Sequence, residues 1–207
     1  MEPKQILAII AALLALVSYI PYLIAVFKKQ LQPHPYTWLI WSIVVGITLA
    51  GQVTSGAGAG ALPTLISEML IICVFLFSLQ FGFKHVKRID NLYLAAALIG
   101  IIPWIITRDP TISVVIAVSI DLTAFIPTIR KIWRDPRSES SVFFTTNAVK
   151  HVFGTLSLQS YNIATALMPV TMIFASFSMA VIILWRRAKH PKKKRLKKRQ
   201  PYSQLWN

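Results

Sequence analysis

Four ionisable side chains lie well inside stretches of the chain that are otherwise apolar, and these residues are the most able to do chemistry. They are Glu68, Asp121, Lys150 and His151. A charge that is removed from water is costly unless it is paired or hydrated, so such side chains face a bundle interior or a water-filled cavity. The sequence therefore predicts a polar site in the middle of the molecule.

Asp121 and Lys150 are expected to lie at the same depth. Asp121 stands partway along the apolar run 112–133, and Lys150 stands partway along the run 142–158, which returns in the opposite direction. At about 1.5 Å of rise per residue, both approach the midplane if the runs are helices. We therefore predict an ion pair between them. The pair either serves packing alone or borders a solute site, and the sequence leaves both interpretations open.

One face of the run 142–158 is polar or small. Asn147, Lys150, His151 and Gly154 follow the i, i+3, i+4, i+7 spacing of a single helix face. The corresponding face of the run 36–53 begins with an aromatic pair and continues with smaller and polar residues, namely Trp38, Trp41, Val45, Thr48 and Gln52. An aromatic wall opposite amide and charged groups suits a small polar solute with a flat or sugar-like face.

We therefore predict that six side chains bind the solute: Trp41, Asn147, Lys150, Asp121, Trp38 and His151. Two of them have a plainer interpretation. Trp38 also fits the belt of aromatic residues at a membrane interface, and His151 also fits a residue that donates to a nearby carbonyl. Glu68 is either a proton-coupling carboxylate or a hydrated residue of an outer vestibule.

The sequence shows no pattern of an enzyme. It has no nucleophile with a base at useful spacing, no cluster of metal ligands, and no glycine loop that follows a strand; "GAGAG" at 56–60 is typical of a flexible linker. The single cysteine, Cys73, excludes an internal disulfide and is interpreted as a small apolar filler. We expect no catalytic residue, no metal and no cofactor.

The elements that position these residues are predicted to be transmembrane helices. Of 207 residues, 55% are hydrophobic and 14% are charged, whereas a soluble domain carries about a quarter charged residues. Apolar runs of about 20 residues cross a bilayer as helices. Seven runs are candidates: 6–27, 36–53, 62–83, 91–106, 112–133, 142–158 and 163–185.

The net charge of +15 is concentrated in alternate connections and in the tail. Because positive connections remain in the cytoplasm, we expect a plasma-membrane protein with its N-terminus outside and its C-terminus inside. The basic tail at 187–207 is expected to be disordered and to attract anionic lipid. It carries no aromatic platform or folded module, so we expect no nucleic acid as a partner.

The chain also repeats itself. A shift of 106 residues places Tyr19-Ile-Pro21 on Phe125-Ile-Pro127, Trp38 on Phe144 and Pro63 on Pro169 without a gap. Two units of three helices, at 5–83 and 111–186, would then be parallel repeats if the linker at 84–110 contributes one inverting helix. The expected fold is thus an all-α membrane protein of seven helices in a 3+1+3 arrangement.

This arrangement resembles the SWEET and PQ-loop (MtN3-like) superfamily of small transporters over residues 5–186. "TWLIW" at 37–41 and "PTIRKIWRDPRSES" at 127–140 are similar to uncharacterised bacterial members with seven helices. The resemblance implies a protein of the bacterial inner membrane in which Pro21 and Pro127 act as hinges; a static packing kink is the alternative. Tyr22 and Thr128 follow the prolines here, so the glutamine of the Pro-Gln pair is missing.

We expect a transporter or facilitator that moves a small polar solute by alternating access between two three-helix bundles. A sugar, a nucleoside, a vitamin or an amino acid fits this expectation. The alternative function is a non-transporting receptor or scaffold on the same fold. The expected partners are the solute and anionic lipid, with a homo-oligomer left open. The sequence does not identify the solute, a coupling ion or a direction.

Overall fold

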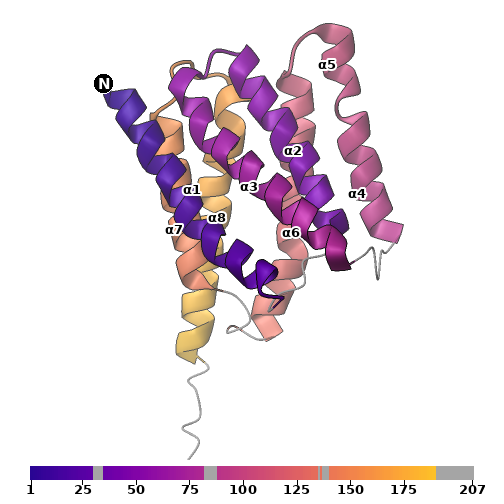
Figure 1. Ribbon diagram of the computed structural model, residues 1–207, viewed down its shortest axis with the longest axis vertical. Coiled ribbons are helices and arrows are strands. Elements are labelled where there is room, and N and C mark those ends of the chain that lie inside the picture. Colours follow the sequence, from indigo (N-terminus) through magenta and orange to yellow (C-terminus); the bar gives the residue numbers. More distant parts are fainter. Residues whose placement is uncertain (30–34, 82–87, 135, 137–139, 190–207) are drawn as a thin grey trace, which may run out of the picture.

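The computed structural model describes residues 1–29, 35–81, 88–134, 136 and 140–189 (Figure 1). Its regular elements in these residues are helical: α1 (Pro3–Phe27), α2 (Pro35–Thr54), η1 (Gly58–Ala61), α3 (Leu62–Ser78), η2 (Leu79–Phe81), α4 (Arg88–Ile99), α5 (Ile102–Thr107), α6 (Thr111–Arg134), α7 (Ser141–Leu156) and α8 (Ile163–Lys189). The all-helical expectation is confirmed for this part of the chain.

Local chemistry fixes where several helices begin. Pro3 occupies the first turn of α1, where its missing N–H would have no partner within the helix. The Oγ of Ser140 accepts from the N–H of Phe143 at 3.2 Å and caps α7. Asp109 does the same before α6, since its Oδ1 accepts from the N–H of Thr111 at 2.9 Å. These hydrogen bonds help to fix where α6 and α7 begin.

Six long helices pack in a ring. Helix α1 packs against α3 and α7, α2 packs against α3 and α6, and α8 packs against α6 and α7 (Figure 1). The order around the ring is therefore α1, α3, α2, α6, α8, α7. Helices α4 and α5 lie outside the ring, where α4 contacts α2 and α6, and α5 contacts α6. Helix α3 lies between α1 and α2, and α8 lies between α6 and α7.

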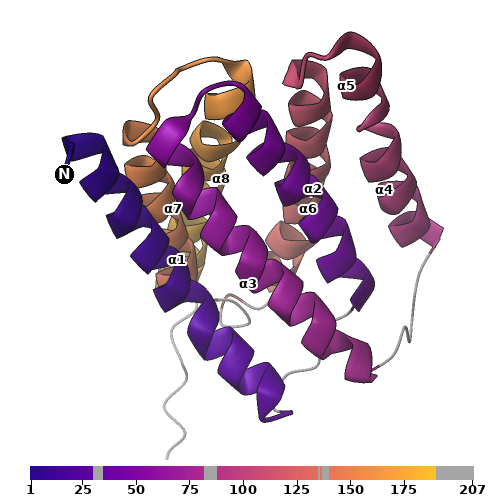
Figure 2. The ribbon, with the colours of Figure 1, turned by 45° about the horizontal axis from the view of Figure 1, so that its top comes forward.

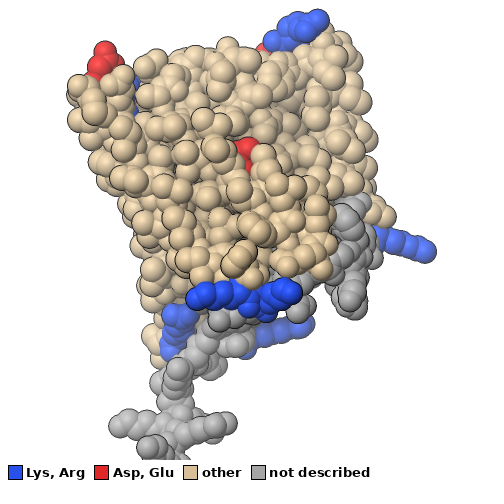
Figure 3. All heavy atoms as spheres, in the orientation of Figure 1, with Lys and Arg blue, Asp and Glu red and all other residues tan. Residues whose placement is uncertain are grey.

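Large apolar side chains cover much of the outer surface. Helix α1 buries the small residues Ala8, Ala11, Ala12 and Ala15, which allow close helix approach. It exposes larger residues such as Leu13, which is 54% exposed. On the face that Figure 3 shows, the described Lys and Arg side chains lie near the two ends, and the surface between them is uncharged apart from one acidic group. Such a surface is typical of a membrane-embedded protein.

Four helices in the described residues are long and apolar enough to cross a membrane: Pro3–Phe27, Thr37–Thr54, Gly58–Ser78 and Ile163–Lys189. The segments Leu94–Thr107 and Thr111–Thr123 are shorter apolar helices, and α7 has 16 residues. Of the seven predicted membrane spans, four therefore correspond to helices in the described residues that are long and apolar enough to cross a membrane.

The predicted single helix at 91–106 is broken in two. Helix α4 ends at Ile99, and α5 begins at Ile102, with Pro103 in its first turn. The N–H of Trp104, which a continuous helix would bond to Gly100, instead donates to the Oγ of Ser113 on α6 at 3.2 Å. A proline and a side-chain acceptor together explain the break.

The connections at one end of the ring lie against each other. The N–H of Gln159, between α7 and α8, donates to the carbonyl of Ala57, between α2 and α3, at 3.0 Å. The amide of Asn162 donates to the carbonyl of Ser55 at 3.2 Å. Figure 2 shows these two connections side by side. We call this the sealed end of the ring, defined by the contacts of 55–60 with 158–162.

Gly60 allows this close approach. A Cβ at Gly60 would lie 2.7 Å from the Cα of Leu158 and 2.9 Å from its N. Because backbone atoms have little freedom to yield, a side chain here forces the two connections apart. Glycine at this position is therefore required by the sealed end.

We expect Gly60→Ala to destabilise the purified protein by about 1–3 kcal/mol, the usual cost of overpacking. Gly46→Ala in α2 is the matched control, because its nearest contact would be the Oε1 of Glu68 at 3.8 Å. Thermal unfolding in detergent measures both variants. Equal melting temperatures for the two variants would contradict the tight contact at the sealed end.

Candidate functional site

A cavity of about 660 Å³ occupies the inside of the ring. Side chains from α1, α2, α3, α6, α7 and α8 line it, so every helix of the ring contributes to its wall. Small-molecule sites in proteins have volumes of roughly 300–1,000 Å³. The cavity is therefore large enough for a solute of modest size.

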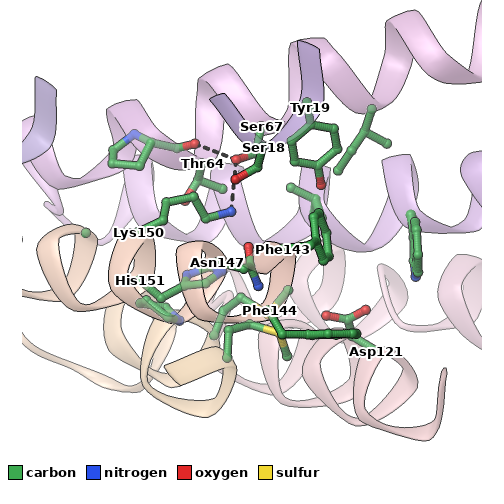
Figure 4. Close-up of a pocket in the computed structure, with 18 of the residues that line it drawn as sticks. Ser18, Tyr19, Thr64, Ser67, Asp121, Phe143, Phe144, Asn147, Lys150 and His151 are labelled. Atoms are coloured by element: carbon green, nitrogen blue, oxygen red, sulfur yellow. Dashed lines mark hydrogen bonds between the residues drawn. The ribbon is translucent and has the colours of Figure 1, made fainter. Parts of the chain in front are cut away.

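Lys150 enters this cavity from α7 and is only 5% exposed. Its Nζ lies 3.4 Å from the Oγ of Ser67 on α3. That hydroxyl in turn donates to the carbonyl of Pro63 at 2.8 Å (Figure 4). A lysine ammonium can donate three hydrogen bonds. Within the described residues, Lys150 makes only this one long contact to a neutral oxygen.

Asp121 lines the same cavity from α6 (Figure 4). The expected ion pair with Lys150 does not form: neither a salt bridge nor a hydrogen bond joins Asp121 to Lys150 or to another described residue. Position along a helix places the two residues at a similar depth, but the lysine points toward α3 instead of the carboxylate.

Asn147 and His151 also line the cavity from α7, as their spacing predicted. The Nδ2 of Asn147 donates to the Oγ of Ser176 on α8 at 2.8 Å, which holds the amide in place. The ring of His151 makes no hydrogen bond within the described residues, so the alternative of a donor to a nearby carbonyl is not met there. Gly154 completes this face of α7.

Trp38 and Trp41 form an aromatic wall. Their ring centroids are 5.1 Å apart in an edge-to-face arrangement, and Tyr22 lies 5.3 Å from Trp38. Trp38 is 7% exposed, so it does not face the surface as a residue of an interfacial belt would. Both tryptophans line the cavity as predicted.

The rest of the predicted α2 face is divided. Gln52 lines the cavity, and its Nε2 donates to the carbonyl of Thr165 at 3.1 Å. Thr48 is buried away from the cavity, with its hydroxyl bonded to the carbonyl of Val44 at 3.0 Å. Of the five residues predicted on this face, Trp38, Trp41, Val45 and Gln52 line the cavity and Thr48 does not.

Glu68 lies outside the cavity wall. Its Oε1 accepts from the Oγ of Ser42 on α2 at 2.9 Å, and its buried Oε2 has no hydrogen-bond partner. With 8% exposure, it is not a hydrated residue of a vestibule. The role of a coupling carboxylate stays a prediction.

The structure describes the two predicted hinge prolines to different extents. Pro21 lies inside the continuous helix α1, and its side chain is exposed. Pro127 falls within the bounds of α6, but its side chain lies outside the described residues. The basic tail also lies outside them from residue 190 onward.

The cavity differs at its two ends. Thr37, Ser140 and Phe143, where α2 and α7 begin, are exposed lining residues. At the sealed end, the lining residues Gln52, Gly60 and Gly154 are buried. The described wall is therefore accessible from the end opposite the sealed one.

Sequence reasoning missed several residues of the wall. They include Ser18, Tyr19 and Tyr22 on α1, Thr64 and Ser67 on α3, Phe143 on α7, and Met168 and Met172 on α8. Serine, threonine and methionine carry no signal that separates a cavity wall from ordinary packing. The shift of 106 residues did contain a usable signal, since Tyr19 falls on Phe125 and both line the cavity.

The arrangement suits reversible binding of a small polar molecule. It offers one ammonium, one carboxylate, amides and hydroxyls beside a broad aromatic surface. In the described residues, no group of three or more His, Cys, Asp or Glu side chains is placed to hold a metal ion. No protein-family model, no curated protein and no solved structure matches this chain.

We expect Lys150→Met to leave the melting temperature unchanged or raised, because it removes a buried charge that has no contacting anion. Lys4→Met is the matched control: it loses a 2.7 Å bond to the carbonyl of Leu158 and should cost about 1 kcal/mol. Thermal unfolding in detergent compares them. A large fall for Lys150→Met that Asp121→Asn restores would instead indicate a direct ion pair.

Proposed function

We propose that this chain is a transporter or facilitator that moves a small polar solute across a membrane. The observation that carries the proposal is a central cavity whose wall is built from repeat-related positions of two three-helix sets. Binding sites of transporters with internal repeats lie at the interface of the repeats near the membrane midplane.

Lining residues occur in pairs related by the shift of 106 residues. The pairs are Tyr19 and Phe125, Thr37 and Phe143, Trp38 and Phe144, Trp41 and Asn147, Val45 and His151, and Pro63 and Pro169. An internal repeat with a central axis places equivalent residues on opposite walls of one cavity. These pairs support the interpretation of α1–α3 and α6–α8 as two copies of one unit.

The packing of the helices supports the same repeat. Under the shift, α1, α2 and α3 correspond to α6, α7 and α8. The contact of α1 with α7 then corresponds to the contact of α6 with α2, and both contacts exist. In each set the third helix separates the first two. We therefore propose the 3+1+3 arrangement, with α4 and α5 together as the inverting segment.

Charge supports an orientation. The ends of α1, α6 and α8 that lie away from the sealed end carry Lys28, Arg134 and Arg187 among the described residues. Because positive connections remain in the cytoplasm, the sealed end faces outward in the proposed topology. The cavity is then accessible from the cytoplasm in this conformation.

Transport requires that the cavity become accessible from the other side as well. The sealed end is held by a small number of hydrogen bonds between two connections, including those of Gln159 and Asn162. Separation of the two three-helix sets at this end would open the cavity outward. The resemblance to the SWEET and PQ-loop superfamily is part of this proposal and rests on the sequence motifs.

Filling the cavity should stop transport without unfolding the protein. A Cβ at Gly154 would meet only Pro63, at 3.9 Å and beyond, and Gly154 lines the cavity, so we expect the ring of Gly154→Phe to enter it. Val149→Phe on the same helix is the control, because Val149 is 40% exposed. Proteoliposomes are tested with radiolabelled glucose, uridine, phenylalanine and thiamine.

We expect uptake of at least one of these solutes by the native protein and by Val149→Phe, and a loss of at least tenfold for Gly154→Phe. Equal uptake by all three proteins would show that the cavity is not the route. Binding of a solute without any uptake would favour the receptor or scaffold on the same fold.

A further inference from the structure

The charged groups of the cavity point to the chemical class of the solute. Among the described residues that line it, Asp121 and Lys150 carry the formal charges, one negative and one positive. They enter the same cavity from different helices (Figure 4). The sum of the two charges is zero, so the site is matched to an occupant without net charge.

Neither charge is satisfied by the protein. The ammonium of Lys150, 5% exposed, has one hydroxyl oxygen at 3.4 Å. That hydroxyl already donates its proton to the carbonyl of Pro63. The carboxylate of Asp121 makes neither a hydrogen bond nor an ion pair within the described residues. Removing an ion from water without a partner is costly, more so for the buried Lys150 than for the half-buried Asp121. This cost is reduced when a ligand supplies both counter-charges.

We propose that the solute is a zwitterion, with a carboxylate that binds Lys150 and an ammonium group that binds Asp121. This inference rests on the proposed function and names the substrate class of the same cavity. Free amino acids are the simplest molecules of this kind. A solute with only one charge would leave either Lys150 or Asp121 without a partner.

The neighbours of the two charges fit such a molecule. Asn147 lines the cavity from the same helix as Lys150, and its amide nitrogen keeps a second N–H that can donate to a carboxylate. The bond from Asn147 to Ser176 holds that amide before the solute arrives. Preorganised polar groups reduce the cost of binding.

The aromatic wall offers a surface for the uncharged part of the solute. Trp38, Trp41 and Phe143 border the cavity and present apolar surface. A cavity of about 660 Å³ leaves room beyond the charged groups for an amino-acid side chain. We therefore expect leucine and phenylalanine to bind more tightly than glycine.

Isothermal titration of the full chain in nanodiscs tests the two charges separately. The probes are leucine and phenylalanine, their amides, which lack the carboxylate, and their N-acetyl derivatives, which lack the ammonium. We expect both kinds of derivative to bind at least tenfold more weakly than the parent amino acid. Because the native protein is used, this measurement does not depend on how a variant folds.

Substitutions then assign each charge. Asp121→Asn should weaken the binding of the parent amino acid at least tenfold and leave the affinity for the N-acetyl derivative unchanged. Lys150→Met should also weaken the binding of the parent amino acid at least tenfold, and it should leave the affinity for the amide unchanged. Asp109→Asn and Lys28→Met are matched controls at exposed positions outside the cavity, and they should bind like the native protein.

Equal affinity for the parent amino acids and both derivatives would overturn the proposal. Uptake of glucose or uridine in the absence of any amino-acid binding would overturn it too, while leaving the transport proposal intact. Amino-acid binding with the expected charge dependence but no flux would support the zwitterion site and contradict transport.

Discussion

A positive charge inside an apolar ring of helices must be balanced by an anion or hydrated. The rest of the structure depends on how the ammonium of Lys150 meets this requirement. In water the ammonium would have a full hydration shell, whereas here its protein contact is one neutral hydroxyl at 3.4 Å. A tightly packed interior would not tolerate such a group. The open space around Lys150 is therefore as necessary to the fold as the side chains that border it. The same space borders both Lys150 and Asp121, and it is where we propose that the solute binds.

The ring supplies that space without losing its closure. Small residues let α1 approach its neighbours closely, and Gly60 brings two connections together at the sealed end. Larger aromatic residues form the wall inside. Contacts between the two proposed repeats are concentrated in α1 with α7 and α2 with α6. Relative movement of the two proposed bodies would therefore have to change chiefly the contacts of these two helix pairs.

Sequence patterns predicted the helices well because each helix must stay apolar over its length. The run 112–133 corresponds to α6 (Thr111–Arg134), and the run 163–185 corresponds to the start of α8 at Ile163. The break between α4 and α5 was missed, because the apolar pattern continues across it. It depends on Pro103 and on a hydroxyl of α6 that the local sequence does not show.

The candidate site could be predicted only in part. Helical spacing correctly grouped Asn147, Lys150 and His151 on one face. It gave the depth of Asp121 but not the direction in which Lys150 reaches, and so it predicted an ion pair that does not form. The partner that Lys150 does contact, Ser67, belongs to α3, whose place between α1 and α2 does not follow from chain order.

The central claim is that one cavity becomes accessible from both sides of the membrane, and labelling of Gly154→Cys in a Cys73→Ala background tests it most directly. An impermeant thiol reagent is applied to sealed vesicles of each orientation. The account predicts labelling from both sides. It also predicts that a disulfide between Ser55→Cys and Asn162→Cys, across the sealed end, blocks labelling from the outside alone. Labelling from one side only, with no effect of that disulfide, would contradict alternating access and indicate a static cavity.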